Sequence, residues 1–305
     1  IQTWFEKSVE GLSGGQKQLL NLAAVMAMQP DLLVLDEPTS QLDPLAAGDF
    51  LATLRKINAE LGTTILLIEH RLEEVLAYAD RVLVMENGGI LALDAPEKLP
   101  SLIRDNDMFQ AMPVPMRIFE ELSGEGDSPV TVREGREWLE EWREEKKTSE
   151  NSCKNQAETV EKLSDTQESE TVDTPEKGRK ISLFGLFSKE SVKGSDDQQP
   201  QTVLEARDVW FRYEKELPDV VRDLNLKVQK GELYCLLGGN GTGKSTTLRL
   251  LGRIKKPYRG KLFLNGKELG TYRESELYGK LLGILPQNPQ WNVSLNGKKK
   301  QSADK

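Results

Sequence analysis

The sequence predicts a mixed α/β fold in which buried parallel strands alternate with helices. Continuous apolar runs, typical of strands buried on both faces, occur at residues 31–37, 63–70 and 232–239. Helical spacing of apolar residues separates the first two runs. A glycine-rich loop, "GGNGTGKS" at 238–245, follows the third run and precedes a further helical pattern. Together these observations indicate the α/β class.

Residues 1–100 alternate helical and strand patterns. Ser13 is predicted to cap a helix over residues 14–29, where apolar residues recur at helical spacing. Asp43 and Pro44 make a cap and first turn for a helix that reaches about Leu61. Residues 81–93 read as two short strands around an Asn-Gly-Gly turn.

The middle of the chain changes character. Residues 101–147 are predicted to be mostly helical, whereas residues 148–200 are rich in Ser, Thr, Glu, Lys and Gln and read as a disordered linker. The apolar island "ISLFGLF" at 181–187 is interpreted as a chance cluster rather than a docking segment. Residues 120–200 carry 21 acidic and 12 basic side chains, which more than accounts for the net charge of −8. A broad basic surface for nucleic acid is therefore not supported.

Regular structure returns at residue 201. Residues 203–213, 224–228 and 232–239 read as strands, and a helix is expected from Lys244. A hairpin is predicted around Asn265-Gly266. Residues 291–305 lose all periodicity and are expected to fray.

The composition excludes several classes of protein. No apolar run approaches the roughly 20 residues that span a bilayer, and no signal-peptide pattern opens the chain. The chain has two cysteines, one in a polar stretch and one in an apolar run, and this usage argues for a reducing compartment. At 305 residues the chain is long enough for about two domains. Because it opens on Ile1 within a helical pattern, we expect it to be a fragment or a truncated product.

The glycine-rich loop matches the phosphate-binding pattern G-x-x-x-x-G-K-[ST] in its expected context. Glycines let backbone N–H groups converge on phosphates at a helix N-terminus, where the helix dipole favours anions. Lys244 is expected to contact the β- and γ-phosphates of a nucleotide, and Ser245 to bind Mg²⁺. The predicted ATP-binding residues of the loop are Gly238, Gly239, Asn240, Gly241, Thr242, Gly243, Lys244, Ser245 and Thr246.

A second set of motifs lies near the start of the chain. "LSGGQ" at 12–16 alone is merely a flexible helix start. It is followed by the strand-like "LLVLDEP", which delivers Asp36 and Glu37 to the carboxyl edge of a sheet. There one carboxylate could hold the water shell of a metal ion while the other polarises an attacking water.

These motifs together resemble an ABC-type ATPase domain. Residues 1–100 are similar to its second half and residues 203–290 to its first half. The resemblance implies a P-loop NTPase fold, ATP and Mg²⁺ as ligands, Glu37 as catalytic base and Asp36 as metal-site acid. It also implies that His70 senses the γ-phosphate, that Tyr213 stacks on adenine and that Gln287 reaches both metal and water. The signature loop would be Leu12, Ser13, Gly14, Gly15 and Gln16, and the loop that links two ATP sites would be Ser40, Gln41, Leu42 and Asp43.

The order of these motifs predicts a tandem architecture. We expect residues 1–100 to be the back half of one ATPase domain and residues 201–290 the front half of a second, joined by the partly disordered acidic connector. The alternative is a permuted single domain, in which both halves pair around one sheet. Only 18 residues follow Gln287 and 11 precede Leu12, and this is shorter than the helical insert that the resemblance to the family implies.

The resemblance also implies a kind of function. Residues 113–139 resemble the C-terminal extension of energy-coupling-factor ATPases, which favours an ATP-hydrolysing transporter subunit on the cytoplasmic face of the cell membrane. Its partners would be a membrane subunit and a second, head-to-tail ATPase domain, and its cargo a vitamin or metal ion. The alternative is a translation-factor ABC protein that binds ribosomes, but its connector is typically basic and this one is acidic. A DNA-repair ATPase would need a long coiled coil, and no heptads appear.

Overall fold

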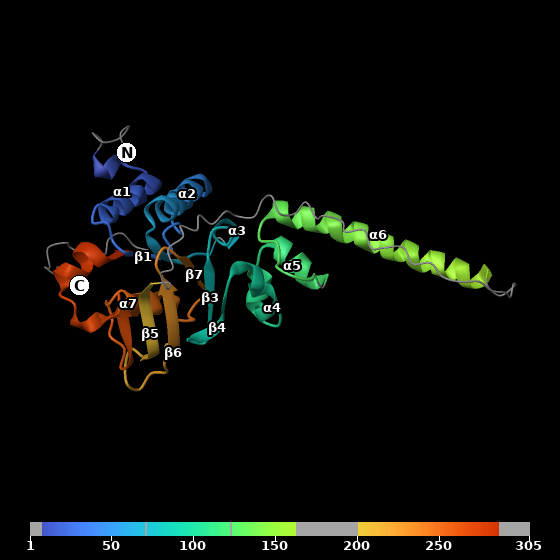
Figure 1. The fold of residues 1–305 in the computed structure, drawn as a ribbon. Helices are drawn as coiled ribbons and strands as arrows, with labels where there is room; N and C mark the ends of the chain where they lie inside the picture. Colours follow the sequence, from blue (N-terminus) through green and yellow to red (C-terminus); the bar gives the residue numbers. More distant parts are fainter. Residues whose placement is uncertain (1–7, 71, 123, 163–200, 287–305) are drawn as a thin grey trace. The chain divides into compact units, whose positions relative to one another are not determined.

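The computed structural model describes residues 8–70, 72–122, 124–162 and 201–286 (Figure 1). Among these described residues, those up to 136 and those from 201 onward form one compact unit, and residues 137–162 belong to another. The apolar island at 181–187, the tail at 291–305 and Gln287 lie outside the described residues.

The larger unit is built on a six-stranded sheet with the order β10-β1-β2-β7-β3-β4. All neighbouring strands are parallel except the antiparallel pair β3 and β4. The predicted apolar runs form β1, β2 and β7, which confirms the α/β class. The strands are β1 (Leu32–Asp36), β2 (Thr64–Ile68), β3 (Arg81–Glu86), β4 (Gly89–Asp94), β7 (Leu233–Gly238) and β10 (Leu282–Leu285).

A second, antiparallel sheet of four strands has the order β6-β5-β8-β9. Its strands are β5 (Thr202–Phe211), β6 (Val221–Gln229), β8 (Arg259–Leu264) and β9 (Lys267–Glu268). The predicted hairpin around Asn265-Gly266 is confirmed, because β8 and β9 pair across it. Asn265 and Gly266 have φ angles of 48° and 75°, which a two-residue hairpin turn of this hand requires.

Two helices begin where the sequence places caps. Ser13 caps α1 and Asp43 caps α2, each through a side-chain oxygen that accepts a backbone N–H. The α-helices of this unit are α1 (Gly14–Met26), α2 (Pro44–Leu61), α3 (Leu72–Val75), α4 (Leu99–Ile103), α5 (Val114–Glu121), α7 (Lys244–Leu251) and α8 (Glu274–Glu276). Shorter helical turns are η2 (Val9–Gly11), η3 (Pro96–Lys98), η4 (Asp107–Ala111), η6 (Leu269–Thr271) and the π-helical η7 (Leu277–Leu281).

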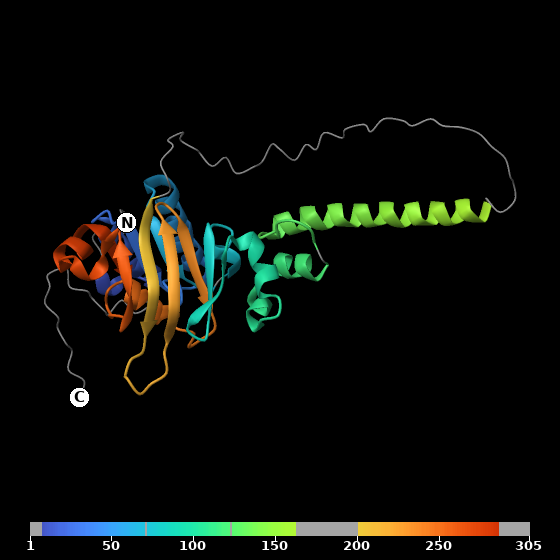
Figure 2. The ribbon, with the colours of Figure 1, turned by 60° about the horizontal axis from the view of Figure 1, so that its bottom comes forward.

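The core lies on both faces of the six-stranded sheet because alternate residues of each strand point to opposite sides. Leu33 and Leu35 pack with α1 and α2, whereas Leu32 and Val34 pack with α7 and the second sheet. Figure 1 shows α1 and α2 on one side and β5 and β6 on the other, and Figure 2 shows the second sheet from its exposed side.

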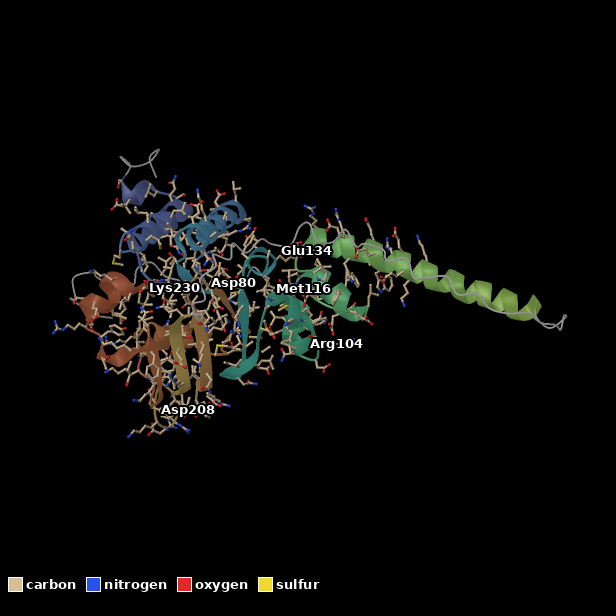
Figure 3. All side chains as sticks on the ribbon, viewed as in Figure 1. Asp80, Arg104, Met116, Glu134, Asp208 and Lys230 are labelled. Carbon is tan, nitrogen blue, oxygen red and sulfur yellow. The ribbon has the colours of Figure 1, made fainter. Side chains whose placement is uncertain are left out.

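Two distant segments of the chain complete one sheet. β7 and β10 come from the segment after residue 201, and β7 lies between β2 and β3 of the first segment. At the start of β7, Leu233 N donates to Asp80 Oδ2 at 2.8 Å and Asp80 N donates to Leu233 O at 2.9 Å (Figure 3). This is the arrangement of the permuted alternative, whereas the tandem interpretation stays a prediction.

Helix α6 (Val132–Lys162) corrects one predicted boundary. Residues 101–147 are mostly helical as expected, but the linker predicted from residue 148 is helical up to Lys162. The low content of apolar residues suggested disorder, yet the Glu, Lys, Gln and Ala residues of 148–162 have high helix propensity and extend the preceding helix. None of the described helices is long and apolar enough to cross a bilayer.

A substitution at Gly283 tests the joint sheet. A Cβ there would collide with Val25 and press on Leu33, both from the first segment. Gly283→Ala should lower the free energy of unfolding by about 1–3 kcal/mol, measured by urea denaturation. Gly48 in α2 has open space around its Cβ position. Gly48→Ala should therefore stabilise the chain by about 0.5–1 kcal/mol. Equal stability of Gly283→Ala and the unmodified chain would contradict the packing of β10 beneath α1.

Candidate functional site

Three parallel strands end side by side at one edge of the six-stranded sheet. β1 ends at Asp36, β2 ends just before Glu69 and His70, and β7 ends at Gly238. Because parallel strands share an edge, the acid pair, the histidine and the glycine-rich loop meet there although the sequence separates them widely.

The glycine-rich loop leaves β7 and enters α7, as the motif predicts. Gly238, Gly241 and Gly243 have φ angles of 151°, 80° and 99°. A Cβ on Gly238 would lie 2.5 Å from Met85 O, and one on Gly243 would lie 2.5 Å from Val220 O. Glycine is therefore required here both for backbone conformation and for the close approach of neighbouring strands.

Lys244, at the start of α7, folds back over this loop. Its Nζ donates to Gly238 O at 2.8 Å and to Gly239 O at 2.9 Å, and the side chain is almost fully buried. Burial lowers the pKa of Lys244, and the nearby Glu37 and Asp36 oppose that shift. The ammonium group thus lies where the loop would surround a phosphate.

Ser245 and Asp36 bring the two chain segments into one site. Ser245 Oγ donates to Asp36 Oδ1 at 3.0 Å. Burial raises the pKa of Asp36, partly offset by the hydrogen bond from Ser245. A hydroxyl and a carboxylate are the hard oxygen donors that suit Mg²⁺, which takes its other ligands from phosphate and water. In the described part of the chain no cluster of three or more His, Cys, Asp or Glu side chains forms a metal site of its own.

Glu37 and His70 are in contact. His70 Nε2 lies 3.0 Å from Glu37 Oε1, so this nitrogen carries the hydrogen when the carboxylate is ionised. Glu37 has a φ angle of 47°, and its backbone N–H donates to Ile68 O at 3.1 Å. The left-handed conformation turns its side chain away from the line of β1 and toward the histidine.

The sequence analysis missed Glu69. Its side chain is 3% exposed and bonds to Thr39 and to the backbone of His70. Burial raises the pKa of Glu69, and its hydrogen bonds oppose that effect. A charged residue at the end of the apolar run "TTILLIEH" was the available signal, because a glutamate is rarely buried without partners.

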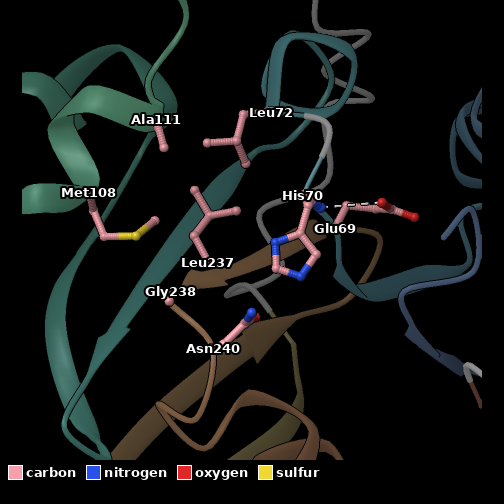
Figure 4. Close-up of a pocket in the computed structure, with 9 residues that line it drawn as sticks. Glu69, His70, Leu72, Met108, Ala111, Leu237, Gly238 and Asn240 are labelled. Carbon is pink, nitrogen blue, oxygen red and sulfur yellow. Dashed lines mark hydrogen bonds between the residues drawn. The ribbon is translucent and has the colours of Figure 1, made fainter.

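A cavity of about 270 Å³ lies beside the histidine and the phosphate loop (Figure 4). Glu69, His70 and Asn240 lie on one side of it, and Leu72, Met108 and Leu237 lie around the other.

Tyr213 lies beside the start of α7 and is half-exposed. Its hydroxyl is 3.0 Å from Thr246 Oγ1, and its ring meets Phe211 edge to face. An exposed aromatic face next to the phosphate loop is compatible with stacking on a base. In the same loop, Thr242 Oγ1 donates to Gly239 O at 3.0 Å and closes the turn.

The signature residues form a different surface. Leu12 is buried, and Ser13 and Gln16 form a reciprocal capping box at the start of α1. Gly14 and Gly15 let α1 approach Leu42 and Ala46, which follow the acid pair. Among the described residues, the hydrogen bonds of Ser13 run to Gln16 and Lys17 of its own helix and not to the phosphate loop.

The loop at residues 40–43 joins the acid pair to α2. Ser40 N donates to Glu37 O at 3.2 Å, and Asp43 Oδ1 accepts from Ala46 N at 2.9 Å. Gln41 is exposed within the turn. The predicted Gln287 lies outside the described residues, so its role stays a prediction.

Comparisons with known proteins agree with this geometry. Residues 2–40 and 221–305 match the family described as ABC transporter. A putative ABC transporter ATP-binding protein of Bacillus thuringiensis subsp. konkukian is 36% identical over 297 residues, which are 97% of this chain and 46% of the relative. The putative HMP/thiamine import ATP-binding protein YkoD of Bacillus subtilis is 30% identical over 93% of this chain and 43% of its own length.

A solved structure titled cbiO1 from Clostridium perfringens, part of the ABC transporter complex cbiONQ, is 32% identical. It covers 40% of this chain and 48% of its own, with a TM-score of 0.32. The fold assignment therefore rests on the sheet order and the family match. The chain spans about half the length of the curated relatives it matches.

Asp36→Asn should raise the free energy of unfolding of the chain at neutral pH in the absence of nucleotide and metal. Because burial raises the pKa of Asp36, the folded chain holds this proton more tightly than the unfolded chain, and ionisation weakens the fold. Asn removes the charge and keeps an oxygen that accepts from Ser245. The difference should be largest above the raised pKa and shrink as the pH falls through it, measured by urea denaturation.

The matched control is Asp49→Asn on the exposed face of α2. It should change the free energy of unfolding little, both at neutral pH and below the raised pKa of Asp36. A loss of stability in Asp36→Asn at neutral pH would contradict the argument.

Proposed function

We propose that this chain, which belongs to the ABC transporter ATP-binding protein family, binds MgATP through residues 238–246 and supplies Glu37 for its hydrolysis. One observation carries the proposal. The hydrogen bond of 3.0 Å between Ser245 Oγ and Asp36 Oδ1 joins the phosphate loop to the acid pair, across 209 residues of sequence. Two motifs that meet in this way form one site.

The phosphate loop is suited to a triphosphate. Lys244 now donates to two carbonyl oxygens of its own loop. Phosphate oxygens are stronger acceptors, so the ammonium group would exchange these bonds for charge-assisted ones. The N-terminus of α7 adds favourable backbone N–H groups and the helix dipole. Tyr213 would stack on the adenine, which its exposed ring and its contact with Thr246 support.

Ser245 Oγ and the Asp36 carboxylate would hold Mg²⁺, and by resemblance Gln287 would join them. When bound, the ion offsets negative charge on the phosphate oxygens. The oxygen donors present are of the type that Mg²⁺ prefers. Binding of the ion would also relieve the buried charge of Asp36.

Glu37 would act as the general base. Its carboxylate takes a proton from a water whose oxygen attacks the γ-phosphorus, while the bond from that phosphorus to the bridging oxygen breaks. His70 Nε2 lies 3.0 Å from Glu37 Oε1 and would hold the carboxylate in place beside the attacking water. His70 would also meet the γ-phosphate, as the resemblance implies.

The exposed position of Ser13 in the signature loop supports the presence of a second ATPase domain. Ser13 caps α1 within a surface separate from the phosphate loop, so it would serve an ATP held by another domain in a head-to-tail dimer. The lengths of the relatives support a tandem protein, since 97% of this chain aligns with 46% of one of them.

ATP-driven closure and hydrolysis-driven opening of this dimer would power transport of a small solute through a membrane subunit. The chain would lie at the cytoplasmic face of the membrane. A vitamin-like cargo is supported by the relative named as an HMP/thiamine import protein, and a metal ion is the other cargo that the extension at 113–139 suggests.

Lys244→Ala should lower MgATP affinity or turnover by roughly 100-fold, because no other side chain in the loop supplies a positive charge to the phosphates. Affinity is measured by titration with a fluorescent ATP analogue, and turnover by phosphate release. Lys261→Ala, which removes an exposed ion pair with Glu268, is the control and should leave both unchanged. Wild-type affinity and turnover in Lys244→Ala would refute the site.

Glu37→Gln separates binding from chemistry. The amide cannot accept the proton of the attacking water, so turnover should fall by at least roughly 100-fold while MgATP still binds. An equal loss of MgATP binding in Glu37→Gln would show that Glu37 maintains the structure of the site rather than taking part in catalysis.

A further inference from the structure

Glu69 is a buried carboxylate to which the proposed reaction assigns no role. It follows the last residue of β2 and precedes His70. Only 3% of its surface is exposed, so its charge requires compensation within the protein.

Both oxygens of Glu69 accept hydrogen bonds. Oε1 accepts from Thr39 N at 3.0 Å and from Thr39 Oγ1 at 2.8 Å. Oε2 accepts from the backbone N of His70 at 3.3 Å. These three donors stabilise the ionised carboxylate and offset part of the cost of burying it.

These contacts hold the two loops that carry Glu37 and His70. Thr39 lies two residues after Glu37, and His70 contacts Glu37 through its ring at 3.0 Å. Asp36 and Ile68 are paired across β1 and β2, so the loops that follow leave the sheet side by side. One buried carboxylate therefore ties the loop of the base to the loop of the histidine.

The loop of the base is also held from its other side. Gln18 Nε2, from the signature helix α1, donates to Pro38 O at 3.1 Å, and Gln18 is buried. With Pro38 held by Gln18 and Thr39 held by Glu69, the backbone beside Glu37 has little freedom to move.

We propose that Glu69 is a positioning residue for ATP hydrolysis, which holds Glu37 and His70 in the geometry that activates water. This inference rests on the proposed function. Glu69 acts through its two loops and does not touch the reacting atoms. Its loss disturbs the base while leaving the phosphate loop, on β7 and α7, in place.

The test uses the only histidine of the chain, because labelled His70 gives a single set of imidazole NMR signals. In the full chain without nucleotide, the chemical shifts of the His70 ring nitrogens should show that Nε2 carries the hydrogen, because Nε2 contacts Glu37. Glu37→Gln serves as a reference, because it shows how the His70 signals change when the contact between His70 and residue 37 is altered. Glu69→Gln has the same shape but turns one acceptor into a donor facing Thr39 or His70. It should shift His70 toward mixed tautomers.

The same variants are assayed for turnover. Glu69→Gln should lower kcat by roughly 10-fold to 100-fold and leave the KM for MgATP within about 2-fold, as expected for a misplaced base. Glu60→Gln, on the exposed surface of α2, is the matched control and should leave the signals and kcat unchanged.

Unchanged His70 signals and kcat in Glu69→Gln would overturn the proposal. If Glu69→Gln fails to fold, Thr39→Val decides, since it removes one donor and keeps the side-chain shape. Altered His70 signals in Thr39→Val support the proposal, and wild-type signals overturn it. Failure of the unmodified chain to bind MgATP, with the His70 signals as expected, would refute the proposed function and leave the tie between the two loops standing.

Discussion

The pairing of β7 with β2 and β3 is the interaction on which the site depends. β7 comes from the second segment of the chain and lies between two strands of the first. Its parallel register with β2 runs from Ile65 and Leu233 to Ile68 and Leu236, so the two strands end at the same edge. Because of this register, the glycine-rich loop emerges beside His70, and Ser245 reaches Asp36. A slip of one residue would turn every side chain of β7 to the opposite face of the sheet and move the glycine-rich loop relative to Asp36 and His70.

The nucleotide-free site satisfies its charges internally. Lys244 donates to two loop carbonyls, Ser245 donates to Asp36, and Glu37 contacts His70. Burial nevertheless raises the pKa of Asp36 and lowers that of Lys244, so each group is less stable in its charged form than it would be in water. Phosphates beside Lys244 and a cation beside Asp36 would add to the opposite charges that already oppose these shifts. The electrostatics of the folded chain therefore favour a ligand that carries both.

Local features were predictable because each depends on residues close in sequence. The caps at Ser13 and Asp43, the hairpin at Asn265-Gly266 and the loop around Lys244 follow from short patterns. From the sequence, the pairing of both segments in one sheet was the alternative interpretation and not the favoured one. Apolar strands of this kind are interchangeable in pattern, and only three-dimensional packing selects neighbours. The hydrogen bonds of buried Glu69 to Thr39 and His70 depend on the pairing of β1 with β2, and the charged residue at the end of the apolar run 63–70 was the local signal for them. The helical extent of 148–162 was missed since composition indicates poor burial but says little about helix propensity.

Neither segment can bury its strands without the other. Without β7, the facing edges of β2 and β3 would lose their hydrogen-bonding partners, and Leu66 and Val84 would lose the neighbours that exclude water. Without the first segment, β7 would carry six buried residues with no parallel neighbour. The same contacts that stabilise the sheet bring the acid pair to the phosphate loop. Folding of this unit and assembly of its site are consequently one event.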